Sequence, residues 1–138
     1  MFNLKKQNLE KVRKLVETDS EIDPKIKDLV MGLRVWGIET MRSCQGHENA
    51  RLFPWVTIDF KDIRDAFRIL CEWNYRLEPR KPIIWVIDPM GEPMIRPLAD
   101  NHTLEKIQED AIKLGTFLQD LPQDFNWLED FEDTIRIP

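Results

Sequence analysis

The stretch from Asp23 to Gly37 constrains the fold most, because it carries both a start signal and a stop signal for one helix. Asp23 is a good N-cap residue, and Pro24 stands at the first helical position, where its missing N–H costs nothing. Gly37 can adopt the left-handed conformation that ends a helix. Between them, apolar residues recur at steps of three and four: Ile26, Leu29, Val30, Leu33 and Trp36. One face of this helix must therefore be buried against other elements.

Other segments show the spacing of helices or strands. Helices are expected over residues 3–17, 61–73 and 103–118, the last of them stopped by Pro122. Strands are expected over residues 38–42, 54–60, 75–79, 83–88 and 94–97. We expect 75–79 and 83–88 to pair through a short connection, and 94–97 to be an edge strand because it ends in a proline.

These elements do not alternate regularly between helix and strand. The order therefore predicts an α+β fold, with a mainly antiparallel sheet of about four or five strands and about four helices. A length of 138 residues favours a single α+β domain over 1–138. The acidic, aromatic tail at about 122–138 is expected to dock as a short helix through Phe125, Leu128 and Phe131, on its own core or on a neighbour.

Composition narrows the class of protein. The net charge of -5 argues against bulk binding of polyanions. No run approaches the roughly 20 apolar residues of a membrane span, and the N-terminal segment lacks a signal-peptide core. The two cysteines lie far apart and make no disulfide framework. We therefore expect a cytoplasmic protein without a membrane partner, and the pattern leaves its oligomeric state open.

The segment TMRSCQGH, residues 40–47, contains one of the two cysteines and one of the two histidines. Cys44 and His47 are three residues apart, and Gly46 between them allows a tight turn that directs both side chains into one space. Three interpretations follow. The turn is structural, with Cys44 packed as a small apolar group; or it supplies two metal ligands; or it forms a ligand-binding or catalytic site.

The ligand-binding interpretation leads. Turn amides and the Ser43 hydroxyl would donate hydrogen bonds to an anion, a nucleotide or a cofactor. Cys44 and His47 are the candidate catalytic residues, because a thiolate beside an imidazolium is an activated nucleophile. Whether the protein is an enzyme stays open. The candidate ligand-binding residues are Thr40, Ser43, Cys44, Gln45, Gly46 and His47.

The metal interpretation needs more ligands than the turn supplies, because zinc usually takes three or four protein ligands. The remaining candidates are Cys71, His102 and the carboxylates. Cys71 falls on the apolar face of its helix, and His102 stands where the last helix begins. No second pair of Cys or His has ligand spacing, so we expect no metal ligands, with a zinc-structured module as a minor alternative.

Other polar features have simpler explanations. Asp59 is expected to cap the following helix, and Asp88-Pro89 to form a turn. Arginines interleaved with Trp55, Trp73, Tyr75 and Trp85 raise the possibility of nucleic-acid binding by stacking. That function is not favoured, because the basic runs and sheet motifs of nucleic-acid-binding domains are absent. The sequence also lacks a Walker loop, G-x-G-x-x-G, H-E-x-x-H and G-x-S-x-G.

Residues 19–58 resemble a segment of the wybutosine-synthesis tRNA methyltransferase family. There, a helix leads through a strand to a Thr/Ser-rich S-C-S-G-R turn and a second strand. The resemblance implies an α+β fold, S-adenosylmethionine as cofactor and a modified guanosine in tRNA as substrate. His47 stands where that family has arginine. The S-C-x-G-H form also resembles a turn in small uncharacterised bacterial and phage proteins. The matching positions are Ile22, Asp23, Ile26, Leu29, Thr40, Ser43, Cys44 and Gly46.

These observations rank the functions. A small-ligand or nucleotide-type site at Thr40–His47 comes first, ahead of a non-catalytic protein-interaction domain that uses the acidic tail. A methyltransferase-like tRNA-modification enzyme and a zinc-structured module follow. An enzyme predicts a cleft over the turn with an exposed Cys44 or His47. A metal site predicts that Cys44 and His47 converge with a third ligand.

Overall fold

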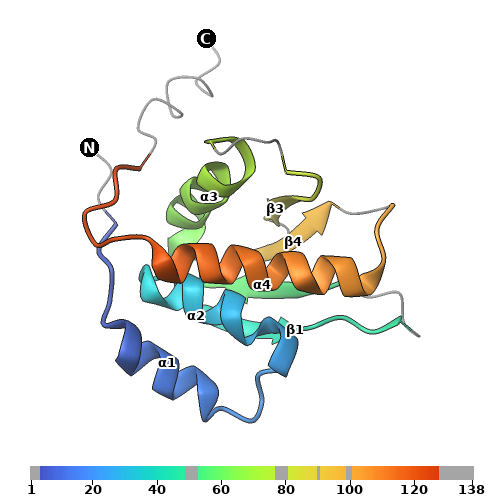
Figure 1. The fold of residues 1–138 in the computed structure, drawn as a ribbon, viewed down its shortest axis with the longest axis horizontal. Coiled ribbons are helices and arrows are strands. Elements are labelled where there is room, and N and C mark those ends of the chain that lie inside the picture. Colours follow the sequence, from blue (N-terminus) through green and yellow to red (C-terminus); the bar gives the residue numbers. More distant parts are fainter. Residues whose placement is uncertain (1–3, 49–52, 77–80, 90, 99–100, 128–138) are drawn as a thin grey trace.

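The computed structural model describes residues 4–48, 53–76, 81–89, 91–98 and 101–127 (Figure 1). Within these residues the helices are α1 (Leu9–Glu17), α2 (Lys27–Val35), α3 (Ile63–Cys71) and α4 (Leu104–Asp120). The strands are β1 (Thr40–Cys44), β2 (Trp55–Ile58), β3 (Ile84–Asp88) and β4 (Met94–Leu98). The fold is α+β, as predicted. No helix in the described part of the chain is long and apolar enough to span a membrane.

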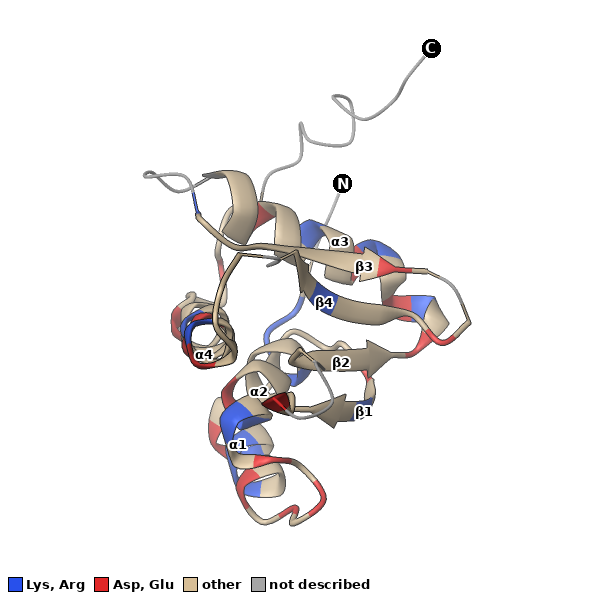
Figure 2. Cartoon of the chain, turned by 90° about the vertical axis from the view of Figure 1, so that its right-hand side faces the viewer, with Lys and Arg blue, Asp and Glu red and all other residues tan. Residues whose placement is uncertain are grey.

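The four strands form one antiparallel sheet in the order β1-β2-β4-β3 (Figure 2). Helices α2 and α4 lie side by side across one face of this sheet, and α1 packs against α2 (Figures 1 and 2). Helix α3 packs beside β3. The layers bury one contiguous apolar cluster.

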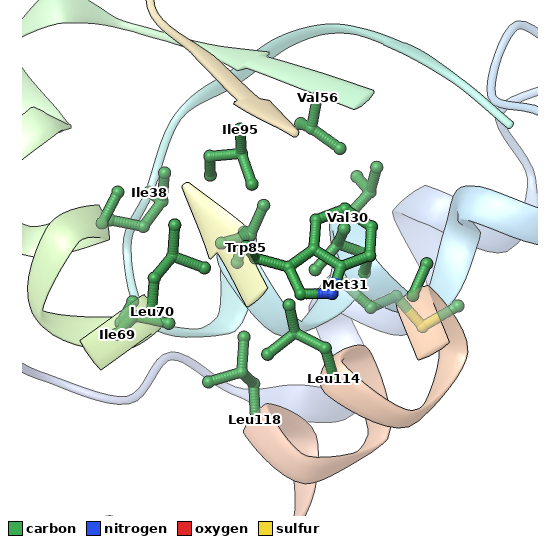
Figure 3. Close-up of a cluster of buried hydrophobic side chains, with 14 of the residues drawn as sticks. Val30, Met31, Ile38, Val56, Ile69, Leu70, Trp85, Ile95, Leu114 and Leu118 are labelled. Carbon is green, nitrogen blue, oxygen red and sulfur yellow. The ribbon is translucent and has the colours of Figure 1, made fainter. Parts of the chain in front are cut away.

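This core is drawn in part in Figure 3. Trp85 from β3 projects from the sheet toward α4 and is 1% exposed. The helices and the other strands surround it with aliphatic side chains, and their burial accounts for the apolar periodicity of the sequence. The labelled side chains are Val30, Met31, Ile38, Val56, Ile69, Leu70, Trp85, Ile95, Leu114 and Leu118.

Two glycines allow α2 and α4 to approach closely. A Cβ built on Gly115 would collide with the backbone of Asp28 and Leu29 in α2, and one built on Gly32 would stand 2.8 Å from the Gly115 carbonyl oxygen. The contact is reinforced by the Gln119 side chain, whose Nε2 donates to the Asp28 carbonyl at 3.0 Å. The backbones of the two helices are therefore in direct contact.

Several local signals are confirmed. Gly37 has a φ of 83° immediately after α2. Thr103 caps α4 by accepting a hydrogen bond from Lys106 N, and Asp59 accepts one from Lys61 N. Helix α1 is shorter than the predicted 3–17, because Asn8 caps it by accepting from Lys11 N. The predicted helix 61–73 contains α3, which continues as a π-helix over Glu72–Arg76.

The predicted strand over 75–79 is wrong at its first two residues, because Tyr75 and Arg76 belong to the π-helix; residues 77–79 lie outside the described residues. The predicted strand over 83–88 is confirmed as β3. On the outer side of β3, the Asn74 side chain pairs with the backbone of Trp85 as a neighbouring strand would. It accepts a hydrogen bond from Trp85 N at 3.1 Å and donates one to Trp85 O at 2.8 Å.

The predicted edge position of 94–97 is also wrong, since β4 lies between β2 and β3. Pro97 is tolerated there because neither neighbouring strand requires a backbone N–H donor at this position. On the β3 side it lies opposite Trp85, whose polar backbone atoms bond to Asn74. On the β2 side, continuing the register past Val56 and Ile95 would bring Pro97 opposite Pro54, and neither proline has an N–H.

The tail is not helical over its described residues, which end at Trp127. Trp127 is 5% exposed and packs edge-on against Trp36 at the end of α2, with ring centroids 5.0 Å apart. Phe125 packs against Trp127. The start of the tail therefore docks on its own chain. The predicted helix contacts through Leu128 and Phe131 lie outside the described residues.

Gly115→Ala is expected to lower the free energy of unfolding by about 1–3 kcal/mol, because the added methyl group must displace the α2 backbone. Helix propensity alone predicts the opposite, a gain of about 1 kcal/mol. Urea unfolding measures the difference. Thr116→Ala, at the exposed next position, is the control and is expected to stay within about 0.5 kcal/mol of wild type. A stabilised Gly115→Ala protein would contradict the close helix contact.

Asp110→Asn is expected to be at least as stable as wild type at pH 7. Burial raises the pKa of the Asp110 carboxyl above its usual range. The ionised form therefore destabilises the fold above the folded-state pKa, and this cost disappears as the pH falls toward the unfolded value of about 3.9. The variant keeps an oxygen for the Trp85 indole N–H, which donates to Asp110 at 2.8 Å.

Urea unfolding at pH 7 and pH 4 tests this pH dependence. Wild type is expected to gain stability relative to Asp110→Asn as the pH falls. Asp120→Asn, which changes an exposed carboxylate at the end of the same helix, is the control. A variant clearly less stable than wild type at pH 7 would show that the charge of Asp110 is needed.

Candidate functional site

Strand β1 contains the first five residues of the predicted 40–47 turn, so Thr40–Cys44 is strand rather than turn. Cys44 lies opposite Trp55 in the antiparallel pairing with β2, and the register is irregular between Thr40 and Ser43. Side chains that follow one another in a strand point to opposite faces. Cys44 faces inward and is 8% exposed, whereas Ser43 is only half-buried.

Thr40 and Ser43 line a cavity of about 240 Å³ on their own side of β1. Its wall also includes Arg34 from α2, whose Nε donates to the Thr40 hydroxyl oxygen at 2.6 Å. His47 does not line this cavity. The structure therefore separates the predicted ligand-binding residues into two groups, with the buried Cys44 between them.

The turn proper begins after Cys44 and depends on Gly46. Gly46 has a φ of 91°, a conformation in which a side chain would be strained. Its backbone N–H donates to Cys44 Sγ at 3.3 Å. The glycine thus folds the chain back over the thiol, and the predicted tight turn is present at this point.

Asp23 is the residue that joins this turn from elsewhere in the sequence. Asp23 occupies the N-cap position of the 3-10 turn Pro24–Ile26, and Pro24 is the first residue of that turn, as predicted, but the Asp23 side chain makes no capping hydrogen bond. Asp23 Oδ2 instead accepts a hydrogen bond from Gln45 N at 3.0 Å. The carboxylate is therefore held against the start of the turn.

Asp23, Cys44 and His47 converge. Their potential ligand atoms all lie within 4.8 Å of one another, with Cys44 buried, Asp23 half-buried and His47 exposed. A carboxylate, a thiol and an imidazole are three groups that proteins use to hold zinc. These three are the one such group in the part of the chain that the structure describes. Convergence with a third ligand is what a metal site predicts.

A larger cavity, of about 450 Å³, opens beside His47. A hydrogen-bond network surrounds it. Lys25 N donates to Gln45 Oε1 at 3.1 Å, Lys25 Nζ donates to Gln108 Oε1 at 3.3 Å, and Gln108 Nε2 donates to the Gln45 carbonyl at 2.9 Å. The lining residues come from the 3-10 turn before α2, from the 45–48 turn and from α4: Lys25, Gln45, Gly46, His47, Glu48, Leu104, Glu105 and Gln108.

Sequence reasoning missed Asp23, Lys25 and Gln108 as members of this site. Asp23 was interpreted only as an N-cap residue, because it stands before a proline. Its carboxylate was not considered as a partner of the 40–47 segment. Gln108 offered one signal in the sequence, because it is a polar residue beside the apolar stripe of α4. The structure shows that this residue is buried, at 6% exposure. Nothing in the local pattern distinguishes Lys25 from other surface lysines.

The second cysteine does not join the site. Cys71 is 4% exposed in α3, as the apolar pattern predicted, and burial raises the pKa of its thiol to about 12. His102 is half-buried just before α4 and is not part of the converging group. Cys44 is also buried, so a nucleophilic role that needs an exposed thiol has less support than a binding role.

Comparison of the chain with known proteins identifies no family to which it is similar. No family model, no curated protein and no solved structure matches the chain. The resemblance of residues 19–58 to the wybutosine-synthesis methyltransferases stays an untested prediction.

Gln108→Ala is expected to loosen the turn, because it removes the donor to the Gln45 carbonyl and the acceptor for Lys25. Losing one such bond costs about 1 kcal/mol. Amide hydrogen exchange is expected to speed up at Gly46 and His47 while the core of the sheet keeps its protection. Glu109→Ala, at an exposed neighbouring position, is the control and is expected to leave the exchange unchanged. Equal exchange in the two variants would contradict the network.

Proposed function

We propose that this domain binds a small, polar, non-aromatic ligand in the pocket between the 45–48 turn and the first half of α4. The observation that supports the proposal is the cavity of about 450 Å³, whose walls present both donors and acceptors. A concave site with a few convergent polar groups is where ligand binding is expected. The proposal keeps the ligand site inferred from the sequence but moves it toward His47 and away from Thr40 and Ser43.

The lining chemistry favours a ligand with mixed polarity. Lys25 contributes an ammonium group, Glu48 and Glu105 contribute carboxylates, and Gln45 offers an amide. Leu104 is the one large apolar side chain among the described lining residues, and the His47 imidazole is the one aromatic ring; none of them is Phe, Tyr or Trp. A nucleobase gains much of its binding energy by stacking on aromatic rings, and a single imidazole offers little stacking area, so a non-aromatic ligand fits this pocket better than a nucleotide.

The competing functions have less support. Trp73 and Trp85 are 6% and 1% exposed, which leaves them unavailable for stacking with nucleic acid, whereas Trp55 is half-buried and Tyr75 is 52% exposed, so only two of the four interleaved rings are accessible. The hypothesis that the tail binds another protein has less support at the start of the tail, because Trp127 already packs against Trp36 of the same chain. The acidic residues beyond Trp127 lie outside the described residues. No contact in the site favours S-adenosylmethionine over other ligands.

Ligand binding is tested by NMR with a panel of amino acids, small carboxylic acids, polyols and nucleosides. Binding of a non-aromatic member is expected to shift the amide signals of residues 45–48 and 104–108. Leu104→Trp fills the pocket with a larger side chain and is expected to abolish these shifts. Ile112→Trp, which enlarges an exposed residue elsewhere on α4, is the matched control and is expected to bind normally.

Two outcomes would contradict the pocket proposal. Shifts confined to residues around Arg34, Thr40 and Ser43 would place the ligand in the smaller cavity instead. Binding that Leu104→Trp leaves intact would place it outside the pocket.

A further inference from the structure

We infer that Asp23, Cys44 and His47 bind one zinc ion beside the pocket. The assignment departs from the expectation, drawn from the sequence, that the turn holds no metal ligands. It rests on the convergence of three different ligand types from two separate segments, with their ligand atoms within 4.8 Å of one another. It deepens the proposed function, since His47 is both a ligand and part of the pocket wall.

The geometry suits an ion of this size. Zinc lies about 2.0–2.3 Å from nitrogen, oxygen and sulfur ligands, so the ligand atoms of a tetrahedral site stand about 3.3–3.8 Å apart. The three ligand atoms lie within 4.8 Å of one another, so the widest pair has to close by about 1 Å. His47 is exposed, so its side chain can rotate to close the difference without disturbing the core.

Charge and ligand type favour zinc over harder cations. Cys44 would bind as a thiolate and Asp23 as a carboxylate, and their two negative charges balance those of the divalent ion. Magnesium and calcium prefer all-oxygen sites, whereas sulfur and imidazole ligands suit zinc. Cys44 is the buried member, which places the softest ligand where water is excluded.

Backbone groups already orient two of the ligands. Gly46 N–H donates to Cys44 Sγ and fixes the position of the sulfur at the start of the turn. Gln45 N–H holds Asp23 Oδ2, and the Asp23 side chain makes no capping hydrogen bond to the helix that follows it. Such outer contacts tune and position ligands in metal sites. They also explain why an aspartate before a proline does not cap its helix here.

Three protein ligands leave a fourth position for water or for a bound molecule, an arrangement typical of catalytic rather than structural zinc. Because His47 lies on the pocket wall, the open position is expected to face the pocket. The ligand proposed above would then complete the coordination through an oxygen, as a carboxylate does. This last step rests on the proposed function, whereas binding of the ion itself does not.

The test uses the full chain after removal of metal with a chelator. Titration with ZnCl2 against a chromophoric zinc chelator is expected to show one ion bound per chain. CoCl2 is expected to give the absorption band of a cobalt–thiolate bond, and MgCl2 is expected not to bind. Zinc is also expected to raise the melting temperature, because it binds the folded state alone.

His47→Ala is the sharpest variant, since an exposed side chain is removed and the fold is preserved. Zinc affinity is expected to fall at least about 10–100-fold, the loss that removing an outer-shell partner alone causes. Cys44→Ser is expected to abolish the cobalt–thiolate band. His102→Ala removes the other histidine and is the matched control, expected to bind zinc as wild type does.

The inference is overturned if the wild-type chain binds no zinc, or if His47→Ala and Cys44→Ser bind it as tightly as wild type does. Leu104→Trp separates this failure from that of the proposed function, because it blocks the pocket and is expected to keep zinc. Zinc binding without any pocket ligand would overturn only the proposed function. If the chain binds a pocket ligand but takes up no zinc in the titration, only the metal assignment is overturned.

Discussion

The direct contact between α2 and α4 is the constraint on which the rest of the structure depends. Gly115 allows α4 to reach the backbone of α2 at Asp28 and Leu29, and Gln119 adds a hydrogen bond across the same seam. The contact fixes where α2 begins relative to the first half of α4. Lys25 and Gln108 can share a hydrogen bond only because the two helices lie this close.

The same helix pair sets the position of the turn. Gln108 of α4 donates to the Gln45 carbonyl, and Asp23, in the segment that leads into α2, accepts from the Gln45 amide, so Gln45 is held from both sides. The end of β1 is thereby fixed to the start of α2, and Gly46 closes the chain over the Cys44 thiol. Cys44 and His47 lie together because a short turn joins them, and the carboxylate beside them comes from Asp23, just before the 3-10 turn that leads into α2.

Sequence reasoning succeeded where a signal is local. The cap at Asp59, the start of α4 near Thr103 and the glycine after α2 each depend on a few neighbouring residues, and each was recognised. The α+β class followed from the order of the elements. The burial of Cys71 followed from the apolar face of its own helix.

Prediction from the sequence failed where the hydrogen-bond or strand partner of a residue lies far away in the chain. Residues 75–79 had strand-like composition, yet Asn74 satisfies the edge of β3 with its side chain and the chain around Tyr75 stays helical. A proline suggested an edge strand, yet Pro97 lies where neither neighbour requires an N–H. Asp23 was predicted to cap the following helix, yet its carboxylate accepts a hydrogen bond from Gln45 N instead of from that helix. In each case the deciding partner is at least ten residues away.

The sequence by itself determined the apolar faces, the helix ends and the presence of a glycine turn that carries sulfur and imidazole. These follow from periodicity and backbone preference, which act over a few residues. Tertiary structure alone decided that Asp23 joins Cys44 and His47, and that Thr40 and Ser43 line a different cavity. Periodicity shows that a face is buried but not what it is buried against, so the partners emerge only when the helices pack.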